Sequence, residues 1–405
     1  MTTHDIRVLD DESDHRAAHT LFRRTLHRGP APDGPWAFLR DAYEPGRALG
    51  AYGDGGLVGT VQSFPSSLAV PGGAVVPMSA VSRVGVRADW TRRGVLTALQ
   101  RVQLRSFRER GDVAATLRAS EAGIYGRYGY GVASRFRKVT IDRLRMGALP
   151  KPTGRVRSVS AADGTDVLRE IFEQVSPVRP GTIGRWPGWW AQNYARVVGT
   201  DEEPQVAVRS GESGDDGYVA YVVDSGGHDD GEDRPATLTV ADLWARTPEA
   251  WVDLWLFVLG VDLVRTVTAA DRPVDEPLEW LVGDRRAVRT VDVVDETWLR
   301  LVDVPEALAR RTYAPVDDTV VLGVRDAFLP ENDGAYVVGR SGVERTSAAP
   351  ELVLDVDRLG SVYLGDLSFA DAAAARRVEV VDPTAPARAD RLFATAEVPW
   401  CGTFF

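Results

Sequence analysis

The sequence predicts an α/β and α+β protein built from three units. The chain of 405 residues is longer than one hydrophobic core usually organises. Strand and helix patterns alternate on both sides of a Pro/Gly break at Leu149–Gly154. Beyond residue 293, short strands and short helices follow one another instead. We therefore expect units at residues 1–150, 151–293 and 294–405.

The first unit shows the clearest succession of elements. Ser13 is the expected N-cap of its first helix, and Gly111 ends its last helix. A Gly/Pro-rich loop over Arg28–Pro35 leads to the aromatic residues Trp36 and Phe38. The expected elements are the strand Ile6–Leu9, the helix Ser13–Leu26, the hairpin strands Ala48–Tyr52 and Leu57–Ser63, the strand Met78–Val86, the helix Val95–Arg110 and the strand Val113–Arg118.

The second unit is expected to repeat the first in a degenerate form. Its hairpin, Val206–Arg209 with Gly217–Tyr221, corresponds to the hairpin of the first unit. No Arg-rich glycine turn precedes a helix here, so we expect a structural role. The other expected elements are the helices Ala161–Val175 and Pro248–Leu259 and the strands Thr237–Leu243 and Val264–Ala269.

The third unit has the pattern of a compact α+β fold. Asp303, followed by Val-Pro, is typical of a helix start. The expected elements are the strand Trp298–Val302, the helix Val304–Arg311, the strands Val320–Val324, Gly334–Val338 and Leu352–Val356, and the helices Asp357–Leu364 and Phe369–Ala375.

The composition narrows the function classes. The 58 acidic residues outnumber the 48 Lys and Arg, which argues against a nucleic-acid partner and favours cationic small molecules. The single cysteine, Cys401, excludes an intrachain disulfide framework and suits a reducing compartment. The first residues lack the apolar core expected of a signal peptide, and no apolar run reaches the ~20 residues needed to span a membrane. We therefore expect a cytoplasmic protein without a membrane partner.

The histidines do not suggest a metal site. They lack metal-ligand spacing, and we expect solvated side chains and no bound metal. The five histidines are His4, His15, His19, His27 and His228.

The strongest chemical signal is the turn that precedes the helix Val95–Arg110. Arg92 and Arg93 are followed by the small Gly94. A helix N-terminus has unpaired N–H groups and partial positive charge, so this turn is suited to bind a pyrophosphate. The preceding Val84-Gly85-Val86 alternates as a strand, and a plain core strand would be the default interpretation without the turn.

This stretch, with Ser120-Glu121-Ala-Gly-Ile-Tyr125-Gly-Arg-Tyr-Gly-Tyr-Gly131 after it, resembles the GCN5-related N-acetyltransferases (GNAT), and within them the Eis (enhanced intracellular survival) type. Thr91 and Leu96 depart from the general superfamily pattern, although Eis-type proteins tolerate the Leu. The resemblance implies tandem GNAT-like domains, one of them degenerate, then a sterol-carrier-protein-like domain. It also implies acetyl-CoA as co-substrate and a homohexamer.

The resemblance assigns acetyl-CoA contacts and a proton donor. Tyr125 matches the residue that protonates the departing CoA thiolate, with Tyr128 and Tyr130 as competing assignments. Ser120 has an alternative role as the cap of a short helix. The implied acetyl-CoA contacts are Val84, Gly85, Val86, Arg92, Arg93, Gly94, Val95, Leu96, Thr97, Ser120 and Glu121.

The C-terminus supplies the expected base. Phe404 and Phe405 are apolar where most chains end in polar residues, so we expect burial of both rings, which would raise the pKa of the terminal carboxylate. In Eis-type enzymes this carboxylate takes the substrate proton, so the resemblance implies the same role for Phe405. A purely hydrophobic anchor is the alternative, and the two roles are compatible.

We therefore expect a cytoplasmic N-acetyltransferase that acts on primary amines of small cationic molecules such as aminoglycosides, polyamines or lysine-type compounds. Trp36, Phe38 and Phe64 are expected to wall the substrate site, and Asp33 either attracts a cation there or is a solvated loop residue. The apolar Phe404 stands where some Eis-type enzymes carry an acid, which weakens the case for aminoglycosides. A non-catalytic regulator that binds acyl-CoA or an apolar ligand, and an enzyme for longer acyl-CoA, remain as alternatives.

Overall fold

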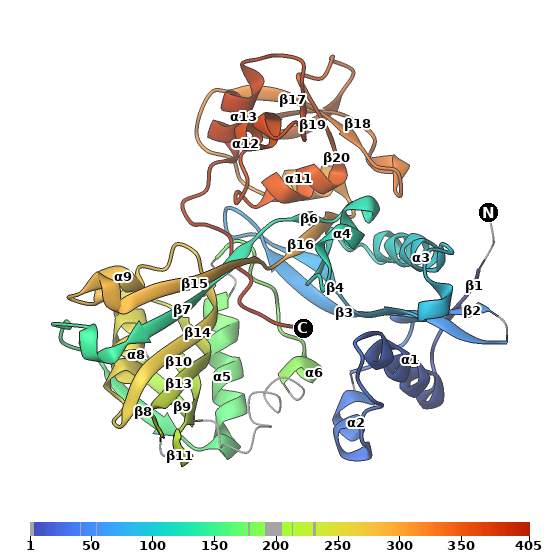
Figure 1. The fold of residues 1–405 in the computed structure, drawn as a ribbon. Helices are drawn as coiled ribbons and strands as arrows, with labels where there is room; N and C mark the ends of the chain where they lie inside the picture. Colours follow the sequence, from blue (N-terminus) through green and yellow to red (C-terminus); the bar gives the residue numbers. More distant parts are fainter. Residues whose placement is uncertain are drawn as a thin grey trace. The chain divides into compact units, whose positions relative to one another are not determined.

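The computed structural model describes residues 4–40, 42–53, 55–176, 179–190, 205–212, 214–229 and 232–405. The chain forms two compact units, each assembled from segments that are distant in sequence (Figure 1). In the structure, the first unit comprises Met1–Ser134, Arg179–Trp189 and Glu296–Phe405, and the second unit comprises Arg135–Val178 and Trp190–Asp295.

The first unit contains a seven-stranded sheet of order β1-β2-β3-β4-β5-β16-β6. Only β4 and β5 pair in parallel. The structure places β16 between β5 and β6, because Trp298 pairs with both Leu117 and Val132. The sequence pattern assigned this strand to the third unit. The strands are β1 (Asp5–Val8), β2 (Ala48–Gly53), β3 (Gly56–Ala69), β4 (Val75–Val86), β5 (Ala114–Leu117), β6 (Gly131–Val132) and β16 (Trp298–Leu301).

Helices cover both faces of this sheet, with α1 on one face and α3 on the other (Figure 1). The expected N-cap Ser13 is wrong. Asp11 caps α1, since its carboxylate accepts the Asp14 N–H at 2.8 Å and also binds the Ser13 hydroxyl. The helices of this part are α1 (Glu12–Thr25), α2 (Asp33–Arg40), α3 (Val95–Glu109), α4 (Ala122–Tyr125) and the short α6 (Pro187–Trp189).

The last hundred residues form a five-stranded sheet of order β19-β18-β17-β20-β21 with four helices. As expected, α10 begins after Asp303, whose side chain accepts the Glu306 N–H. The strands are β17 (Thr319–Arg325), β18 (Gly334–Gly339), β19 (Gly342–Thr346), β20 (Leu352–Asp355) and β21 (Glu379–Val380), and the helices are α10 (Val304–Arg310), α11 (Val356–Tyr363), α12 (Phe369–Ala374) and α13 (Ala385–Phe393).

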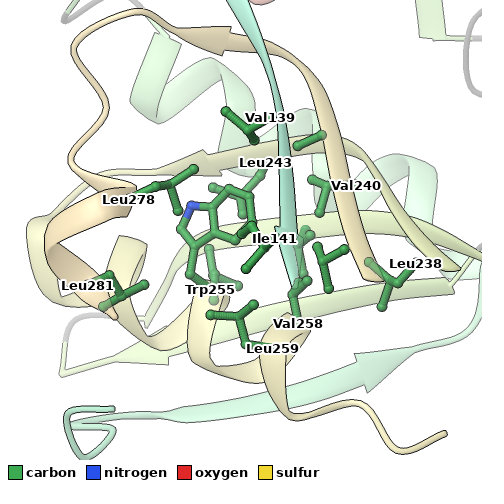
Figure 2. Packing of buried hydrophobic residues seen from close by; sticks show 14 of the residues in the cluster. Val139, Ile141, Leu238, Val240, Leu243, Trp255, Val258, Leu259, Leu278 and Leu281 are labelled. Atoms are coloured by element: carbon green, nitrogen blue, oxygen red, sulfur yellow. The ribbon is translucent and has the colours of Figure 1, made fainter. Parts of the chain in front are cut away.

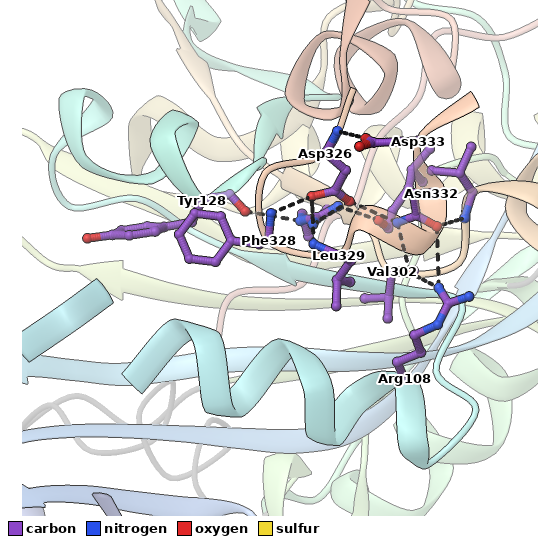
Figure 3. A network of polar contacts seen from close by, with 11 residues as sticks. Arg108, Tyr128, Val302, Asp326, Phe328, Leu329, Asn332 and Asp333 are labelled. Carbon is purple, nitrogen blue, oxygen red and sulfur yellow. Dashed lines mark hydrogen bonds and ion pairs between the residues drawn. The ribbon is translucent and has the colours of Figure 1, made fainter. Parts of the chain in front are cut away.

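This part packs closely on the first sheet. A Cβ at Gly131 would lie 1.8 Å from the Asp357 carbonyl oxygen, so α11 requires glycine there. A buried ion pair joins Arg300 of β16 to both oxygens of Asp326 at 2.7 Å. Asp326 also accepts the backbone N–H groups of Phe328 and Leu329 (Figure 3). Arg300 Nε also donates to the Tyr128 carbonyl at 3.0 Å. Through Arg300, the last hundred residues thus support the segment that follows Tyr125.

The second unit contains a seven-stranded sheet of order β15-β7-β14-β13-β10-β9-β8, and β11 pairs with β12 separately. Its apolar core surrounds the fully buried Trp255 of α8 (Figure 2). The strands are β7 (Arg135–Asp142), β8 (Arg155–Val159), β9 (Gln205–Gly211), β10 (Gly214–Asp224), β11 (Gly227–Asp229), β12 (Glu232–Arg234), β13 (Ala236–Ala245), β14 (Val264–Pro273) and β15 (Val288–Asp295), and the helices are α5 (Ala161–Val175), α8 (Pro248–Gly260) and α9 (Leu278–Leu281).

The second unit repeats a strand–helix–parallel strand arrangement, β13-α8-β14, of the kind that β4-α3-β5 forms in the first. The α8 N-terminus differs from that of α3, because Pro248 opens it and the Thr247 side chain accepts the Ala250 N–H. One of its N-terminal donors is therefore absent and another is bound within the chain, which leaves this end less suited to an anion than that of α3.

Candidate active site

The strands β4 and β5 separate next to the expected acetyl-CoA site. Their pairing ends where Ala80 faces Thr116, whereas β4 continues to Val86. The β3–β4 register shifts next to Arg83, whose φ is 52°. A bulge bends a strand and re-aims its residues, and here it lies in the section of β4 beyond Ala80 that does not pair with β5.

The predicted thioester strand occupies this unpaired section. Val84 and Val86 are half-buried and pack against the cluster that contains Val95. Gly85 is directed toward α1, where a Cβ would lie 3.1 Å from the Phe22 Cα. Gly85 thus allows close packing of α1, while its neighbours lie on the α3 side.

The turn before α3 has the features of an anion site. Arg92 and Arg93 are exposed, and Gly94 caps α3 in the left-handed region at φ 82° without any side-chain cap bond. The Arg93 guanidinium lies 5.1 Å from the centre of the Trp90 ring. Uncapped N–H groups beside two exposed cations fit the pyrophosphate of acetyl-CoA.

The remaining turn residues and the loop after β5 differ in burial. Val95 is buried and Leu96 is half-buried. Thr97 Oγ1 lies 3.4 Å from the Tyr128 hydroxyl. Ser120 and Glu121 are exposed, and Glu121 rather than Ser120 is the N-cap of α4, so the alternative capping role of Ser120 is wrong.

Burial separates the three tyrosines. Tyr130 is 0% exposed and Tyr128 is 3% exposed, whereas Tyr125 at the end of α4 is 8% exposed. Burial raises the pKa of Tyr125 to about 12, with smaller contributions from Tyr128 and Glu121. The Tyr125 phenol is therefore neutral at neutral pH, and the residue keeps more exposed surface than Tyr128 or Tyr130.

A chain of aromatic contacts connects the predicted substrate walls with the C-terminus. Phe64 stacks on Trp186 at 4.4 Å, and the Trp186 ring lies 6.2 Å from the Phe405 ring. The Arg83 guanidinium lies between Tyr43 and Phe64, 4.8 and 5.4 Å from their ring centres. Trp36 joins this cluster 6.0 Å from Tyr43. The Phe38 side chain lies outside the described residues.

The C-terminal tail, Pro399–Phe405, is held by the segment Arg179–Trp189. Trp400 N donates to the Pro180 carbonyl at 2.9 Å, Arg185 Nε binds the Thr403 hydroxyl at 3.2 Å, and Trp189 Nε1 donates to the Phe404 carbonyl at 2.6 Å. The expected burial of both rings is wrong for Phe404, which is 42% exposed, while Phe405 is half-buried. The tail is thus held by hydrogen bonds to its backbone and to Thr403 and by burial of the Trp400, Cys401 and Thr403 side chains.

The expectation of solvated histidines needs correction. His15 and His19 are buried, not solvated: His15 stacks on Tyr43 at 4.3 Å, and burial lowers the pKa of His19 to about 3. Asp33 forms an exposed ion pair with Arg16. The His228 side chain lies outside the described residues.

Sequence reasoning missed Arg83, Trp186 and Glu296. Arg83 and Trp186 lie in segments with recognisable sequence features, whereas no such feature surrounds Glu296. Within the described ranges, no group of three or more His, Cys, Asp or Glu is placed to hold a metal. No helix in the same part of the chain is both long and apolar enough to cross a membrane.

Comparison with known proteins agrees with this arrangement. Residues 5–133 and 181–301 each match an acetyltransferase (GNAT) domain, and residues 304–402 match a sterol carrier protein domain. The chain is 38% identical to Eis1 from Mycobacterium abscessus, with a TM-score of 0.91 over 100% of both chains. It is 32% identical to the N-acetyltransferase Eis of Mycobacterium bovis, over 93% of this chain and 90% of that protein.

The chain belongs to the Eis family of N-acetyltransferases. An uncharacterized N-acetyltransferase from Streptomyces avermitilis is 36% identical over 99% of both chains. The Eis-type chain therefore combines two GNAT domains with a sterol carrier protein domain, and it is an acetyltransferase. GNAT acetyltransferases use acetyl-CoA as co-substrate, which fits the uncapped α3 N-terminus.

Proposed function

We propose that this protein transfers the acetyl group of acetyl-CoA directly to a primary amine of a small molecule. Acetyl-CoA supplies the activated thioester. The residues Arg92–Thr97 hold its pyrophosphate, Ser120 and Glu121 border it, and the backbone of Val84–Val86 holds the pantetheine arm and polarises the carbonyl.

In this proposal the terminal carboxylate of Phe405 removes a proton from the acceptor amine as the C–N bond forms. The single observation that carries the proposal is the attachment of the tail to Arg179–Trp189, which ends in the contact of the Phe405 ring with Trp186, itself stacked on Phe64. A terminus held this way differs from the usual frayed chain end. It supports a preorganised base.

Tyr125 is the proposed acid, which donates its proton to the CoA thiolate as the C–S bond breaks. Its raised pKa keeps the phenol protonated at neutral pH. Tyr130 is fully buried and Tyr128 lies against Thr97, so neither competes well for this role.

The acceptor class, assembly and compartment also belong to this proposal. We infer a cationic acceptor of the aminoglycoside, polyamine or lysine type, with Trp36, Phe38 and Phe64 as its walls, and a cytoplasmic homohexamer. Light scattering after size-exclusion chromatography measures the assembly.

The first experiment measures CoA release from acetyl-CoA with a panel of polyamines, aminoglycosides and lysine peptides. The native chain is compared with one that carries Gly-Ser after Phe405. Loss of at least 100-fold in kcat on extension, with unchanged affinity for CoA, is expected if the terminal carboxylate is the base. Equal rates in the two forms would remove Phe405 from the chemistry. Propionyl- and longer acyl-CoA in the same assay test the acyl preference.

A further inference from the structure

Glu296 is a buried carboxylate that the proposed chemistry does not use. Its residue is 1% exposed, and both oxygens are fully engaged. Oε1 accepts Gly402 N at 2.8 Å and Arg118 Nη2 at 3.0 Å. Oε2 accepts Cys401 N at 2.8 Å and the Ser134 hydroxyl at 2.9 Å.

Two of these four donors are consecutive amides of the C-terminal tail. They converge on one carboxylate beside Gly402, which has a left-handed φ of 61°. Two successive N–H groups in such a turn form an anion-binding concavity. Here the protein's own side chain occupies it, three residues before the terminal carboxylate.

Arg118 connects this clamp to the acetyl-CoA side of the site. Besides its bond to Glu296, its guanidinium lies 5.1 Å from the centre of the Phe404 ring. Arg118 directly follows β5, and the chain then leads through Ser120 and Glu121 to Tyr125. The clamp thus joins the tail to the strand end that leads to the proposed acid.

We propose that Glu296 is a positioning residue that holds the C-terminal tail so that the Phe405 carboxylate reaches the acceptor amine. The catalytic part of this inference rests on the proposed function, whereas the clamp itself does not. Chain termini are mobile unless they are tied down, and a base must lie within hydrogen-bond reach of its proton. Glu296 supplies that attachment.

The test uses Glu296→Gln. The amide keeps the size of the side chain but replaces one acceptor oxygen with an NH₂ group, which cannot accept. Whichever way the amide turns, Cys401 N or Gly402 N loses its partner. The matched control is Asp112→Asn, a buried carboxylate of the same unit that accepts the Ser79 hydroxyl at 2.6 Å.

Cys401 provides a readout that needs no activity. It is the only cysteine of the chain and is fully buried, and burial raises the pKa of its thiol to about 12. In native protein the thiol should react slowly with a disulfide reagent such as dithiobis-nitrobenzoate. Release of the tail would expose it, so we expect Glu296→Gln to react at least tenfold faster, and Asp112→Asn to react like the native chain.

In Glu296→Gln we expect kcat to fall about 10- to 100-fold, with the dissociation constant for CoA within twofold of native. Gly402→Ala, which disfavours the left-handed backbone, should produce the same two changes to a smaller extent. If Glu296→Gln fails to fold, Gly402→Ala provides the test instead.

The two ideas fail separately. Thiol reaction no faster than in Asp112→Asn would overturn the clamp, whatever the activity. Fast thiol reaction with native kcat would show a clamp without catalytic importance and would overturn the positioning role. If no acceptor is acetylated by the native chain, the proposed function fails while the thiol reaction still decides the clamp.

Discussion

At the residue scale, the buried environment of Tyr125 raises the pKa of its phenol and leads to a prediction for catalysis. Burial raises its pKa from the ordinary 10.0 to about 12, so the phenol is protonated throughout the working range. We expect Tyr125→Phe to lower kcat by about 10²–10³ with little change in KM for acetyl-CoA. Initial rates at several pH values measure this, and native-like kcat in the variant would exclude Tyr125 as the acid.

The same shift predicts a loss of stability in alkali. A raised folded-state pKa means that the neutral phenol is favoured by folding, so its contribution is fully present below pH 10 and is lost as the pH rises toward 12. Urea unfolding at pH 9 and pH 11 should show a smaller loss for Tyr125→Phe than for the native chain. An equal loss would contradict the shifted pKa.

His19 predicts the opposite pH dependence. Burial and nearby Arg83 lower its pKa from 6.5 to about 3, and neither ring nitrogen has a hydrogen-bond partner among the residues that the structure describes. The unfolded chain therefore takes up a proton as the pH falls below 6.5, while the folded chain does not. Relative to His19→Leu, the native protein should lose on the order of 1–2 kcal/mol of stability between pH 7 and pH 5.

Urea unfolding at the two pH values measures this difference. His27→Asn is the control, because the His27 side chain is exposed and its left-handed backbone suits Asn. A His19→Leu variant with the same pH dependence as the native chain would show that His19 titrates normally.

At the element scale, α3 has glycines in the left-handed region at both ends, which offers a matched pair of variants. Gly94 has φ 82° and Gly111 has φ 80°, and a Cβ has space at either position. Alanine at each site should cost roughly 1–2 kcal/mol through backbone strain. Only Gly94→Ala disturbs the proposed pyrophosphate turn, so KM for acetyl-CoA should rise about tenfold there and stay native in Gly111→Ala.

Steady-state kinetics and urea unfolding of both variants separate stability from binding. An equal KM for the two variants would place the pyrophosphate elsewhere. The two variants can be compared directly because both glycines have a left-handed backbone, whereas only Gly94 lies in the proposed pyrophosphate turn.

The elements that the sequence predicted well are those with local causes. The turn Arg92–Gly94, the α3 helix and the Asp303 cap depend on residues adjacent in the chain. The N-cap of α1 was missed because Asp11 and Ser13 are both good caps, and their mutual hydrogen bond decides between them only in three dimensions. The buried His19 was missed because burial depends on the partner elements.

At the scale of the whole molecule, long-range pairing limited the prediction. The pattern identified Trp298–Val302 as a strand but could not show that it lies between β5 and β6. Glu296 lies two positions before Trp298, where that strand begins, and its partners are Arg118, Ser134 and the tail. No sequence spacing reports such contacts. The boundaries at residues 150 and 293 stay predictions.

The ion pair between Arg300 and Asp326 predicts how strongly the last hundred residues stabilise the sheet of the first unit. Both side chains are almost fully buried, and Arg300 also holds the Tyr128 carbonyl. Asp326→Ala leaves the Arg300 charge buried without its carboxylate, which should cost about 3–5 kcal/mol. The control Glu306→Ala breaks the exposed pair with Arg310 and should cost less than about 1 kcal/mol. Urea unfolding of both variants tests this, and similar small losses would mean that packing of α11 on Gly131 is the main connection.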